Sequence, residues 1–315
     1  MAARERVLIT GGSGFIGANL AHDLVAEGHD VHLLLRPEAR TWRLAGLTGR
    51  YAAHAADLCD ARALRRAVAA CRPDVIYHLA THGAYPSQRD RPAILATNLL
   101  GTANLLDALA GHDYRALVHT GSSSEYGRKD GPMREDDRPE PRTDYGVAKT
   151  AATLLCQAEA HQGRPVTTVR VFSAYGPWEE PTRLVPYVMG CCLRGDTPRV
   201  TAGSQPRDFI YVGDVIELLK RAAHHARAVG QVLHAGTGRQ HTVRDMIEAI
   251  VAVCGNGRVR PDYGAEPQRP GEPACWVASI EHTTALTGWR PRHGLAGGAA
   301  RTAEWLAAAL PTAAA

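Results

Sequence analysis

Short apolar runs alternate with helical patterns in the first half of the chain. The runs are rich in Val, Ile and Leu, and the stretches between them carry apolar residues at helical spacing. Alternation of this kind is typical of βαβ units around a parallel sheet. We expect strands at 7–9, 31–35, 75–79, 116–119 and 166–171. We expect helices at 15–27, 61–70, 93–109 and 145–160.

The alternation ends after Pro177, where many prolines separate short elements. Helices are still expected at 214–228, 242–253 and 297–309. The fold class that this pattern predicts is α/β: a doubly wound parallel sheet of Rossmann type with a smaller mixed α/β lobe at the C-terminal side. We expect one compact body with a cleft, because no linker separates the halves.

Composition excludes several classes of protein. The 315 residues are 45% hydrophobic and 22% charged, which is ordinary for a globular chain. No apolar stretch approaches the ~18 residues of a membrane span, and a net charge of +4 without a basic block argues against nucleic acid. The charged start leads straight into a strand, so we expect a cytoplasmic protein without a signal peptide. The seven cysteines form no CxxC pair, so we expect reduced, mostly buried thiols and no metal.

A glycine-rich turn follows the first strand and opens the first helix. Thr10-Gly-Gly-Ser-Gly-Phe-Ile-Gly17 places glycines at 11, 14 and 17. Glycine permits the tight turn and the close approach of backbone to a pyrophosphate, which then lies at the helix N-terminus. The strand–turn–helix context favours a dinucleotide site over a plain glycine-rich turn.

The end of the second strand predicts which dinucleotide is bound. An acidic residue there usually binds a ribose 2′-hydroxyl, whereas arginine binds a 2′-phosphate. The strand ends at Leu35-Arg36-Pro37, and Arg40 follows. NADP(H) is therefore favoured over NAD(H), with an ordinary exposed Arg36 as the alternative. Asp57-Leu58 is placed to hold the adenine.

Tyr145 and Lys149 lie one helical turn apart and share a face of the predicted helix. An ammonium group near a phenol favours the phenolate, so we expect Lys149 to lower the pKa of Tyr145. Such a tyrosine can move a proton at neutral pH. The strand at 116–119 leads into the serine-rich segment 121–127, where a hydroxyl can hold the same substrate oxygen.

The order of these motifs resembles that of the extended short-chain dehydrogenases/reductases that act on nucleotide sugars, over nearly the whole chain. The matching segments are TGGSGFIG (10–17), Asp57-Leu58, HLA (78–80), Asn98 in TNLLGT, GSSSEYG (121–127), YGVAK (145–149), RVFSAYGP (170–177), RDFIYV (207–212) with Asp214, GTG (236–238) and RPGE (269–272).

The resemblance implies a role for each matching residue. Tyr145 is the acid/base, Lys149 its partner, and Ser122 the catalytic hydroxyl, with Ser123 as the alternative if the register shifts. The dinucleotide is expected to contact Gly11, Ser13, Gly14, Phe15, Ile16, Gly17, Arg36, Arg40, Asp57, Leu58, Leu79, Ala80, Thr81, Asn98, Tyr145 and Lys149. The substrate is expected to contact His82, Tyr85, Gln88, Ser173, Tyr175, Arg207, Tyr211 and Arg269.

The resemblance also implies a division of the chain. Residues 1–177, with returning segments at roughly 208–240, would bind the dinucleotide, and residues 178–315 would mainly bind the nucleotide sugar. The helices at 93–109 and 145–160 match those through which the family dimerises, so we expect a homodimer. Ser173 replaces the usual asparagine, which puts one expected contact to the diphosphate in doubt.

The reaction depends on the residues beside Ser122. Related dehydratases and decarboxylases carry a Glu within the two positions after the catalytic hydroxyl, but here these are Ser123 and Ser124 and the carboxylate, Glu125, comes one place later. Elimination needs a positioned base. With Arg36, this favours NADPH-dependent reduction of a 4-keto-deoxysugar on a nucleoside diphosphate. The alternatives are an NAD-dependent epimerase, then a 4,6-dehydratase or decarboxylase that uses Glu125; a non-catalytic sensor would be expected to lack Tyr145 or Lys149.

Overall fold

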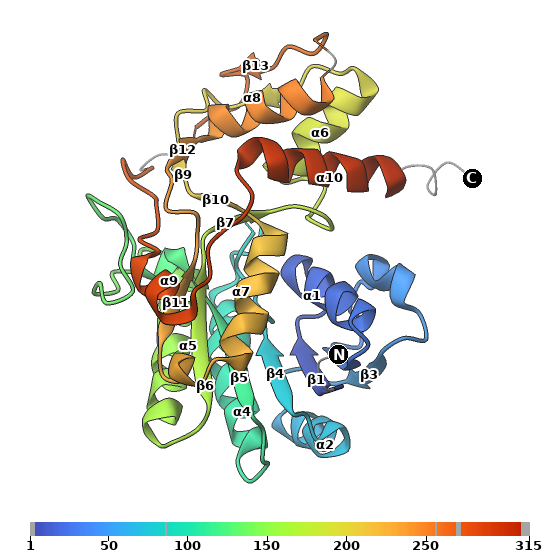
Figure 1. The fold of residues 1–315 in the computed structure, drawn as a ribbon, viewed down its shortest axis with the longest axis vertical. Helices are drawn as coiled ribbons and strands as arrows, with labels where there is room; N and C mark the ends of the chain where they lie inside the picture. Colours follow the sequence, from blue (N-terminus) through green and yellow to red (C-terminus); the bar gives the residue numbers. More distant parts are fainter. Residues whose placement is uncertain (1–3, 86, 256, 269–271, 310–315) are drawn as a thin grey trace.

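A seven-stranded, fully parallel sheet forms the centre of the computed structural model, which describes residues 4–85, 87–255, 257–268 and 272–309. The strand order is β11-β6-β5-β4-β1-β2-β3 (Figure 1). This order reverses beside β1, as in a Rossmann fold, and confirms the predicted fold class. The strands are β1 (Arg6–Thr10), β2 (Asp30–Leu35), β3 (Ala52–Ala55), β4 (Val75–His78), β5 (Ala116–Ser122), β6 (Val166–Val171) and β11 (Val232–Ala235).

Helices cover both faces of this sheet because successive residues of each strand point to opposite sides. Val7 and Ile9 of β1 pack with α1 and α7, whereas Leu8 packs with α2, α4 and α5 on the other face. Both faces are therefore apolar, which explains why the strands are continuous hydrophobic runs. These helices are α1 (Phe15–Ala26), α2 (Ala61–Cys71), α4 (Gly101–Leu109), α5 (Asp144–His161) and α7 (Val212–His224), and the 3₁₀ helix η1 (Trp42–Leu47) packs beside α1.

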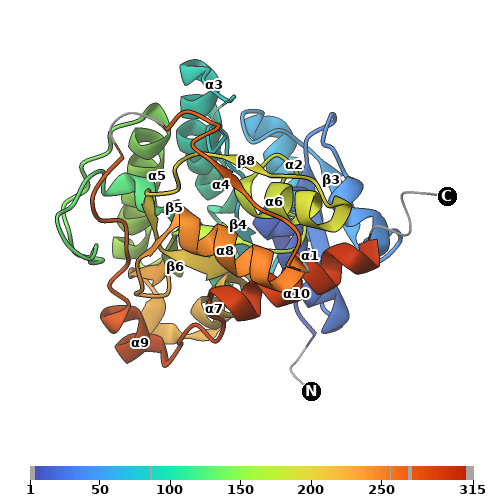
Figure 2. The ribbon, with the colours of Figure 1, turned by 90° about the horizontal axis from the view of Figure 1, so that it is seen from above.

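Part of the chain after Pro177 builds a smaller cluster at one end of the sheet, where α6, α8 and α10 lie together (Figures 1 and 2), whereas α7 and β11 belong to the main sheet. Three two-stranded pairs, β7–β10, β9–β12 and β8–β13, accompany these helices. The bounds are β7 (Ser173–Tyr175), α6 (Leu184–Arg194), β8 (Arg199–Val200), β9 (Pro206–Arg207), β10 (Phe209–Tyr211), η4 (Ala226–Ala228), β12 (His241–Thr242), α8 (Val243–Cys254), β13 (Asp262–Tyr263), α9 (Glu281–Thr287) and α10 (Leu295–Ala309).

The helix predicted at 93–109 is broken into three parts. A short α3 (Arg91–Leu95), a π-helical turn η2 (Ala96–Leu100) and α4 follow one another. The buried amide of Asn98 lies in the π-helical turn and bonds to the carbonyl oxygens of Ile94 and His82. An inserted polar side chain of this kind favours a π-bulge over a regular helix. The pattern of apolar residues cannot reveal it.

Two further differences have simple causes. β3 was not predicted because its sequence, Ala-Ala-His-Ala, lacks the β-branched residues typical of strands. α6 was not predicted because Pro186 lies within its first turn, where a proline is tolerated. Five of the seven thiols are buried and none is disulfide-bonded, but Cys59 is exposed. Within the described ranges, the helices are all too short or too polar to cross a membrane.

Candidate active site

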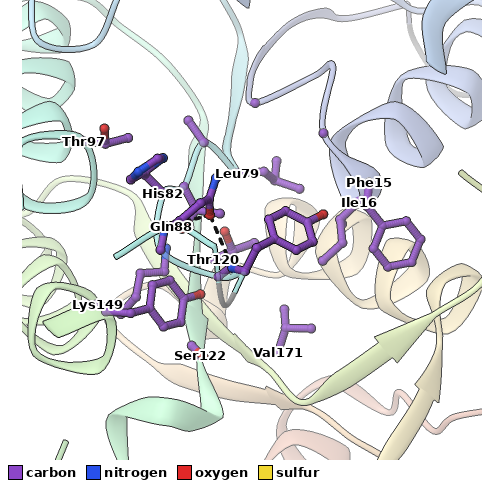
Figure 3. Close-up of a pocket in the computed structure, with 18 of the residues that line it drawn as sticks. Phe15, Ile16, Leu79, His82, Gln88, Thr97, Thr120, Ser122, Lys149 and Val171 are labelled. Atoms are coloured by element: carbon purple, nitrogen blue, oxygen red, sulfur yellow. Dashed lines mark hydrogen bonds between the residues drawn. The ribbon is translucent and has the colours of Figure 1, made fainter. Parts of the chain in front are cut away.

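The carboxyl ends of the central strands and parts of the second half enclose a cavity of about 1070 Å³. The glycine-rich turn with Phe15 and Ile16 lines one side, and Ser122 and Lys149 line the other (Figure 3). His82 and Gln88 lie on the loop after β4 at the same cavity. Ligands of open α/β sheets bind at this edge, where the strand order reverses.

The glycines of the turn are required by close backbone contacts. Gly11 has a φ of +71°, and a Cβ there would lie 2.6 Å from Ala80 N. A Cβ on Gly17 would lie 2.2 Å from Gly11 O, so only glycine lets α1 start against the turn. The amide of Gly14 bonds to Gly11 O at 2.9 Å and makes Gly14 the N-cap of α1. The start of α1 lines the cavity, and the unpaired amides of a helix N-terminus are suited to bind a phosphate group.

The far end of the cavity is basic. Arg36 and Arg40 are exposed after β2 and line the cavity together with Glu38. Asp57 and Leu58 also line it, and Asp57 Oδ1 accepts a hydrogen bond from Cys59 N at 2.7 Å. The predicted ribose and adenine residues therefore lie together. These charges do not by themselves distinguish NAD(H) from NADP(H), because the guanidinium groups of Arg36 and Arg40 and the carboxylate of Glu38 all line this end of the cavity.

Tyr145 and Lys149 lie in the first two turns of α5, as predicted, and both line the cavity. Thr143 caps the helix by accepting a hydrogen bond from Gly146 N at 3.0 Å. A Cβ on Gly146 would lie 2.6 Å from Ser124 O, so this glycine lets α5 approach the end of β5. The approach places Ser122 beside the phenol.

The pKa of Tyr145 is raised, so the predicted lowering by Lys149 is wrong for this structure. Burial of the phenol is the main cause, and the Ser122 and Thr81 hydroxyls lower the pKa only in part. The charge of Lys149 acts on the buried imidazoles of His78 and His119 instead, whose pKa it helps to lower. Burial lowers the pKa of Lys149 itself to about 8.

Glu125 points away from the cavity. It ends the 3₁₀ turn η3 (Ser123–Glu125), is fully buried, and its Oε2 accepts from Arg170 Nε at 2.8 Å. Its Oε1 accepts from the backbone N of Ser122 at 2.8 Å, completing a capping box. Burial raises the pKa of Glu125, opposed by the charge of Arg170. Ser123 and Ser124 line the cavity, but Glu125 is not among the described residues that do.

Asn98 does not contact the cavity as predicted. Its side chain is saturated by four hydrogen bonds: it donates to the carbonyl oxygens of His82 and Ile94 and accepts from Thr81 Oγ1 and His82 N. Its neighbour Thr97 lines the cavity, whereas Asn98 is absent from the lining within the described chain. Asn98 therefore fixes the loop that carries Thr81, and a ligand has no free group of its amide to bind.

Five of the eight predicted substrate residues line the cavity: His82, Tyr85, Gln88, Ser173 and Arg207. Tyr175 and Tyr211 do not, because their rings pack on each other and on α10 and His293 in the smaller cluster. Arg269 lies outside the described residues. Arg207 forms an ion pair with Glu272 at 2.8 Å. The next residue, Asp208, is buried, and its carboxylate accepts hydrogen bonds from the backbone amides of Thr237, Gly238 and Ala278. These bonds fix the strand that carries Arg207.

Among the further cavity residues, Glu179, Arg183 and Trp276 lie in no motif that the sequence analysis recognised. Glu179 stands out because it is 8% exposed and its Oε2 has no hydrogen-bond partner. Its Oε1 accepts only from Arg183 Nε at 3.4 Å. Burial raises the pKa of Glu179 to about 7, although Arg183 and Arg43 oppose the shift.

Replacing Glu179 by Gln is expected to stabilise the protein at pH 8 but not at pH 4. The folded state binds a proton at Glu179 up to about pH 7, whereas the unfolded state loses it near pH 4.5, so stability falls as pH rises between these values. The Gln variant cannot ionise, so it avoids this fall in the free energy of unfolding, which amounts to at most ~3 kcal/mol. Urea unfolding of both proteins at pH 4, 6 and 8 measures the difference, and a pH-independent difference would contradict it.

Comparison with known proteins explains this constellation. The model of the NAD dependent epimerase/dehydratase family matches residues 7–236, which include the glycine-rich turn, Ser122, Tyr145 and Lys149. The chain belongs to this family. Within it, the extended short-chain dehydrogenases/reductases share the Rossmann sheet and the Tyr-x-x-x-Lys helix described above, which confirms the resemblance noted in the sequence.

Relatives in the epimerase/dehydratase family match nearly the whole chain. A UDP-glucose 4-epimerase of Mycolicibacterium smegmatis is 30% identical over 95% of this chain and 98% of its own. A UDP-N-acetyl-α-D-glucosaminuronate decarboxylase of Bacillus cytotoxicus is 30% identical over 78% of this chain and 79% of its own. The solved structure of MoeE5 in complex with UDP-glucuronic acid and NAD is 30% identical, has a TM-score of 0.81, and the match covers 96% and 99% of the two chains. These relatives span different reactions, so family membership alone leaves the reaction of this chain open.

Proposed function

We propose that this protein interconverts the C4 epimers of a sugar attached to a nucleoside diphosphate, with UDP-sugars as the first candidates. This is the reading that the sequence analysis placed second to 4-ketoreduction. The names of the relatives favour it, because they include a UDP-glucose 4-epimerase and none of the three names given above is that of a ketoreductase.

The buried position of Glu125 carries the choice of reaction. Dehydration and decarboxylation require further groups to remove protons or carbon dioxide, and elimination needs a positioned base. Ser123 and Ser124 occupy the two positions after Ser122 and line the cavity. Glu125 accepts a hydrogen bond from Arg170 and is not among the described residues that line the cavity. Hydride and proton exchange at a single carbon need only the hydroxyl, the phenol and a dinucleotide.

The residues of the cavity fit a nicotinamide dinucleotide. Gly11 and Gly17 leave no room for a Cβ, so at these two positions the turn can bring its backbone close to a phosphate at the start of α1. When bound, the dinucleotide supplies an acceptor and donor of hydride. Residues 1–177 with roughly 208–240 would hold it, while residues 178–315, through Arg207 and Arg183, would hold the nucleotide sugar.

The proton steps fall to three side chains. In its ionised form, Tyr145 takes the proton of the C4 hydroxyl as that carbon is oxidised, and the resulting neutral phenol later returns a proton to the same oxygen. Ser122 donates a hydrogen bond to this oxygen and stabilises the charge that develops on it. Lys149 lies one helical turn after Tyr145, is buried, and has a pKa lowered to about 8, so it can exchange a proton near neutral pH. Inversion at C4 would require the keto-sugar to turn within the cavity between its oxidation and its reduction.

Isotope labelling tests the proposed reaction. UDP-glucose and UDP-glucuronic acid deuterated at C4 are incubated with the enzyme, and the products are analysed by NMR. We expect C4-inverted sugar that retains the deuterium, with no net change in NADH or NADPH. A product that has lost water or carbon dioxide, or reduction of an added 4-keto-sugar with one NADPH consumed per turnover, would refute epimerisation.

A second candidate is the NADPH-dependent 4-ketoreduction predicted from the sequence, and one observation favours it. Arg36 and Arg40 both reach the cavity where an adenosine ribose would lie, and a guanidinium binds phosphate well. A reductase draws electrons from outside, usually from NADPH, whereas an epimerase regenerates its own cofactor. The relative of known structure named above binds NAD, so the preference for NADP(H) is a proposal about this chain alone.

Changing Arg36 to Ala is expected to weaken NADPH binding about 10–100-fold and NADH binding little, because a charged hydrogen bond to the 2′-phosphate is worth roughly 1.5–3 kcal/mol. Fluorescence titration with both dinucleotides measures the ratio. Arg65→Ala, on the exposed face of α2, is the matched control. Equal loss for both dinucleotides would show that Arg36 does not discriminate.

We further propose a homodimer through the helices that include η2 and α5. Leu100 and Leu154 are each 57% exposed and Val147 is 48% exposed, which is a large apolar exposure for neighbouring helices. Light scattering at micromolar concentration is expected to give twice the chain mass, and Leu154→Lys to give a monomer. A monomeric wild-type protein would contradict the proposal.

A further inference from the structure

A histidine pair and a buried thiol meet at the edge of the sheet, away from the cavity. His32 of β2 and His54 of β3 point to the same face, because Leu34, which shares the face of His32, pairs with His54 across the strands. Cys71, the last residue of α2, packs on that face. One nitrogen of each imidazole and the Cys71 sulfur all lie within 4.8 Å of one another.

The two imidazoles share a single proton. His32 Nδ1 and His54 Nε2 are 2.8 Å apart and their ring planes differ by only 17°, so one lone pair and one N–H occupy the space between them. A metal ion would be bound by the lone pairs of the neutral imidazoles.

The second ring nitrogen of His32 lies near a carboxylate. His32 Nε2 is buried without a hydrogen bond and lies 3.4 Å from Asp30 Oδ2. Metal-binding histidines commonly direct their second nitrogen at a carboxylate, which fixes the tautomer so that the first nitrogen offers its lone pair. A small rotation of the ring would form this bond and aim Nδ1 at the shared space.

We propose that His32, His54 and Cys71 form a binding site for a divalent ion of the zinc type. Two imidazoles and a thiolate are the ligands that Zn²⁺ prefers, with water in the fourth position. Zinc bonds of ~2.0–2.3 Å place tetrahedral ligands roughly 3.3–3.7 Å apart. The imidazole nitrogens must separate slightly, and the sulfur, which lies within 4.8 Å of both, must approach them by up to roughly 1–1.5 Å. On binding, the thiol loses its proton to solvent and the histidines remain neutral.

The bound ion would join three elements at an edge of the fold. β3 is the outermost strand of the sheet and pairs only with β2 among the described strands, and Cys71 ends the helix above it. The bound ion would stabilise this edge of the sheet without changing the cavity. It is independent of the function proposed above.

Titration with Co²⁺ tests the site in the intact protein. We expect a sulfur-to-cobalt charge-transfer band that saturates at one equivalent, is displaced by Zn²⁺, and is lost in Cys71→Ser. The matched controls Cys254→Ser, a buried thiol in the smaller cluster, and Cys59→Ser, an exposed thiol, should keep the band.

His54→Gln is a second test in case Cys71→Ser does not fold. Because His54 is only half-buried, its replacement should be tolerated. It should weaken Co²⁺ binding at least 10-fold and abolish the rise in melting temperature that Zn²⁺ gives the wild type. Absence of the band at excess Co²⁺ would overturn the proposal. So would a band that survives Cys71→Ser or disappears in Cys59→Ser.

Discussion

Replacing Tyr145 by phenylalanine is expected to lower kcat by about 10²–10⁴-fold, the usual contribution of a positioned acid–base group. The substitution removes only the phenolic oxygen, which lies with the Ser122 and Thr81 hydroxyls at the cavity. Dinucleotide affinity and melting temperature should therefore stay close to those of the wild type. Single-turnover kinetics with saturating sugar nucleotide measure the effect on the chemical step.

Tyr114→Phe is the matched control for this experiment. Its hydroxyl is also buried, but it lies near Arg164 and does not line the cavity. The control variant should turn over at the wild-type rate. If Tyr145→Phe also kept near wild-type turnover, the assignment of the acid–base group would be wrong, whatever the reaction is.

Replacing Glu125 by glutamine is expected to lower the free energy of unfolding by about 3–5 kcal/mol, because it leaves the buried guanidinium of Arg170 without its partner charge. The Arg170 side chain is 4% exposed, so water cannot take over the lost interaction. Chemical denaturation measures the change. Below the melting temperature of the variant, kcat should remain within a few-fold of the wild type, because the carboxylate faces away from the cavity.

The same variant separates a structural role of Glu125 from a catalytic one. If Glu125 were the base of an elimination, Glu125→Gln would lose activity while keeping most of its stability. The double variant Glu125→Leu with Arg170→Met removes both charges, and replacing a buried ion pair by apolar groups is often close to neutral. It should recover much of the lost stability, and failure to do so would show that the hydrogen bond to Ser122 N matters more than the ion pair.

The main features of the fold could be predicted from local pattern because they rest on local causes. Strands buried on both faces must be continuously apolar, and the helices between them must show a helical repeat, so the alternation up to residue 171 indicates a doubly wound sheet. The glycines at 11 and 17 are likewise demanded by the backbone of one short turn. Tyr145 and Lys149 share a face because they are four residues apart in a helix.

Other features depend on neighbours distant in the chain. Asn98 matches a family motif, yet its side-chain oxygen accepts hydrogen bonds from Thr81 and His82, which are seventeen and sixteen residues away in the chain. Tyr175 and Tyr211 belong to a motif around the site, but their rings pack into the smaller cluster. Glu179 and Arg183 reach the cavity from a segment with no recognisable spacing.

The sequence by itself determined the class of fold, the dinucleotide turn and the Ser–Tyr–Lys set, because each of these is written in residues close together or in a strict repeat. Only the tertiary structure decided that Glu125 is turned to Arg170, since a carboxylate three residues from Ser122 can point either way until β6 supplies a buried positive charge. Only the tertiary structure also brought His32, His54 and Cys71 together, because parallel pairing of β2 with β3 and the packing of α2 join residues that no local spacing connects.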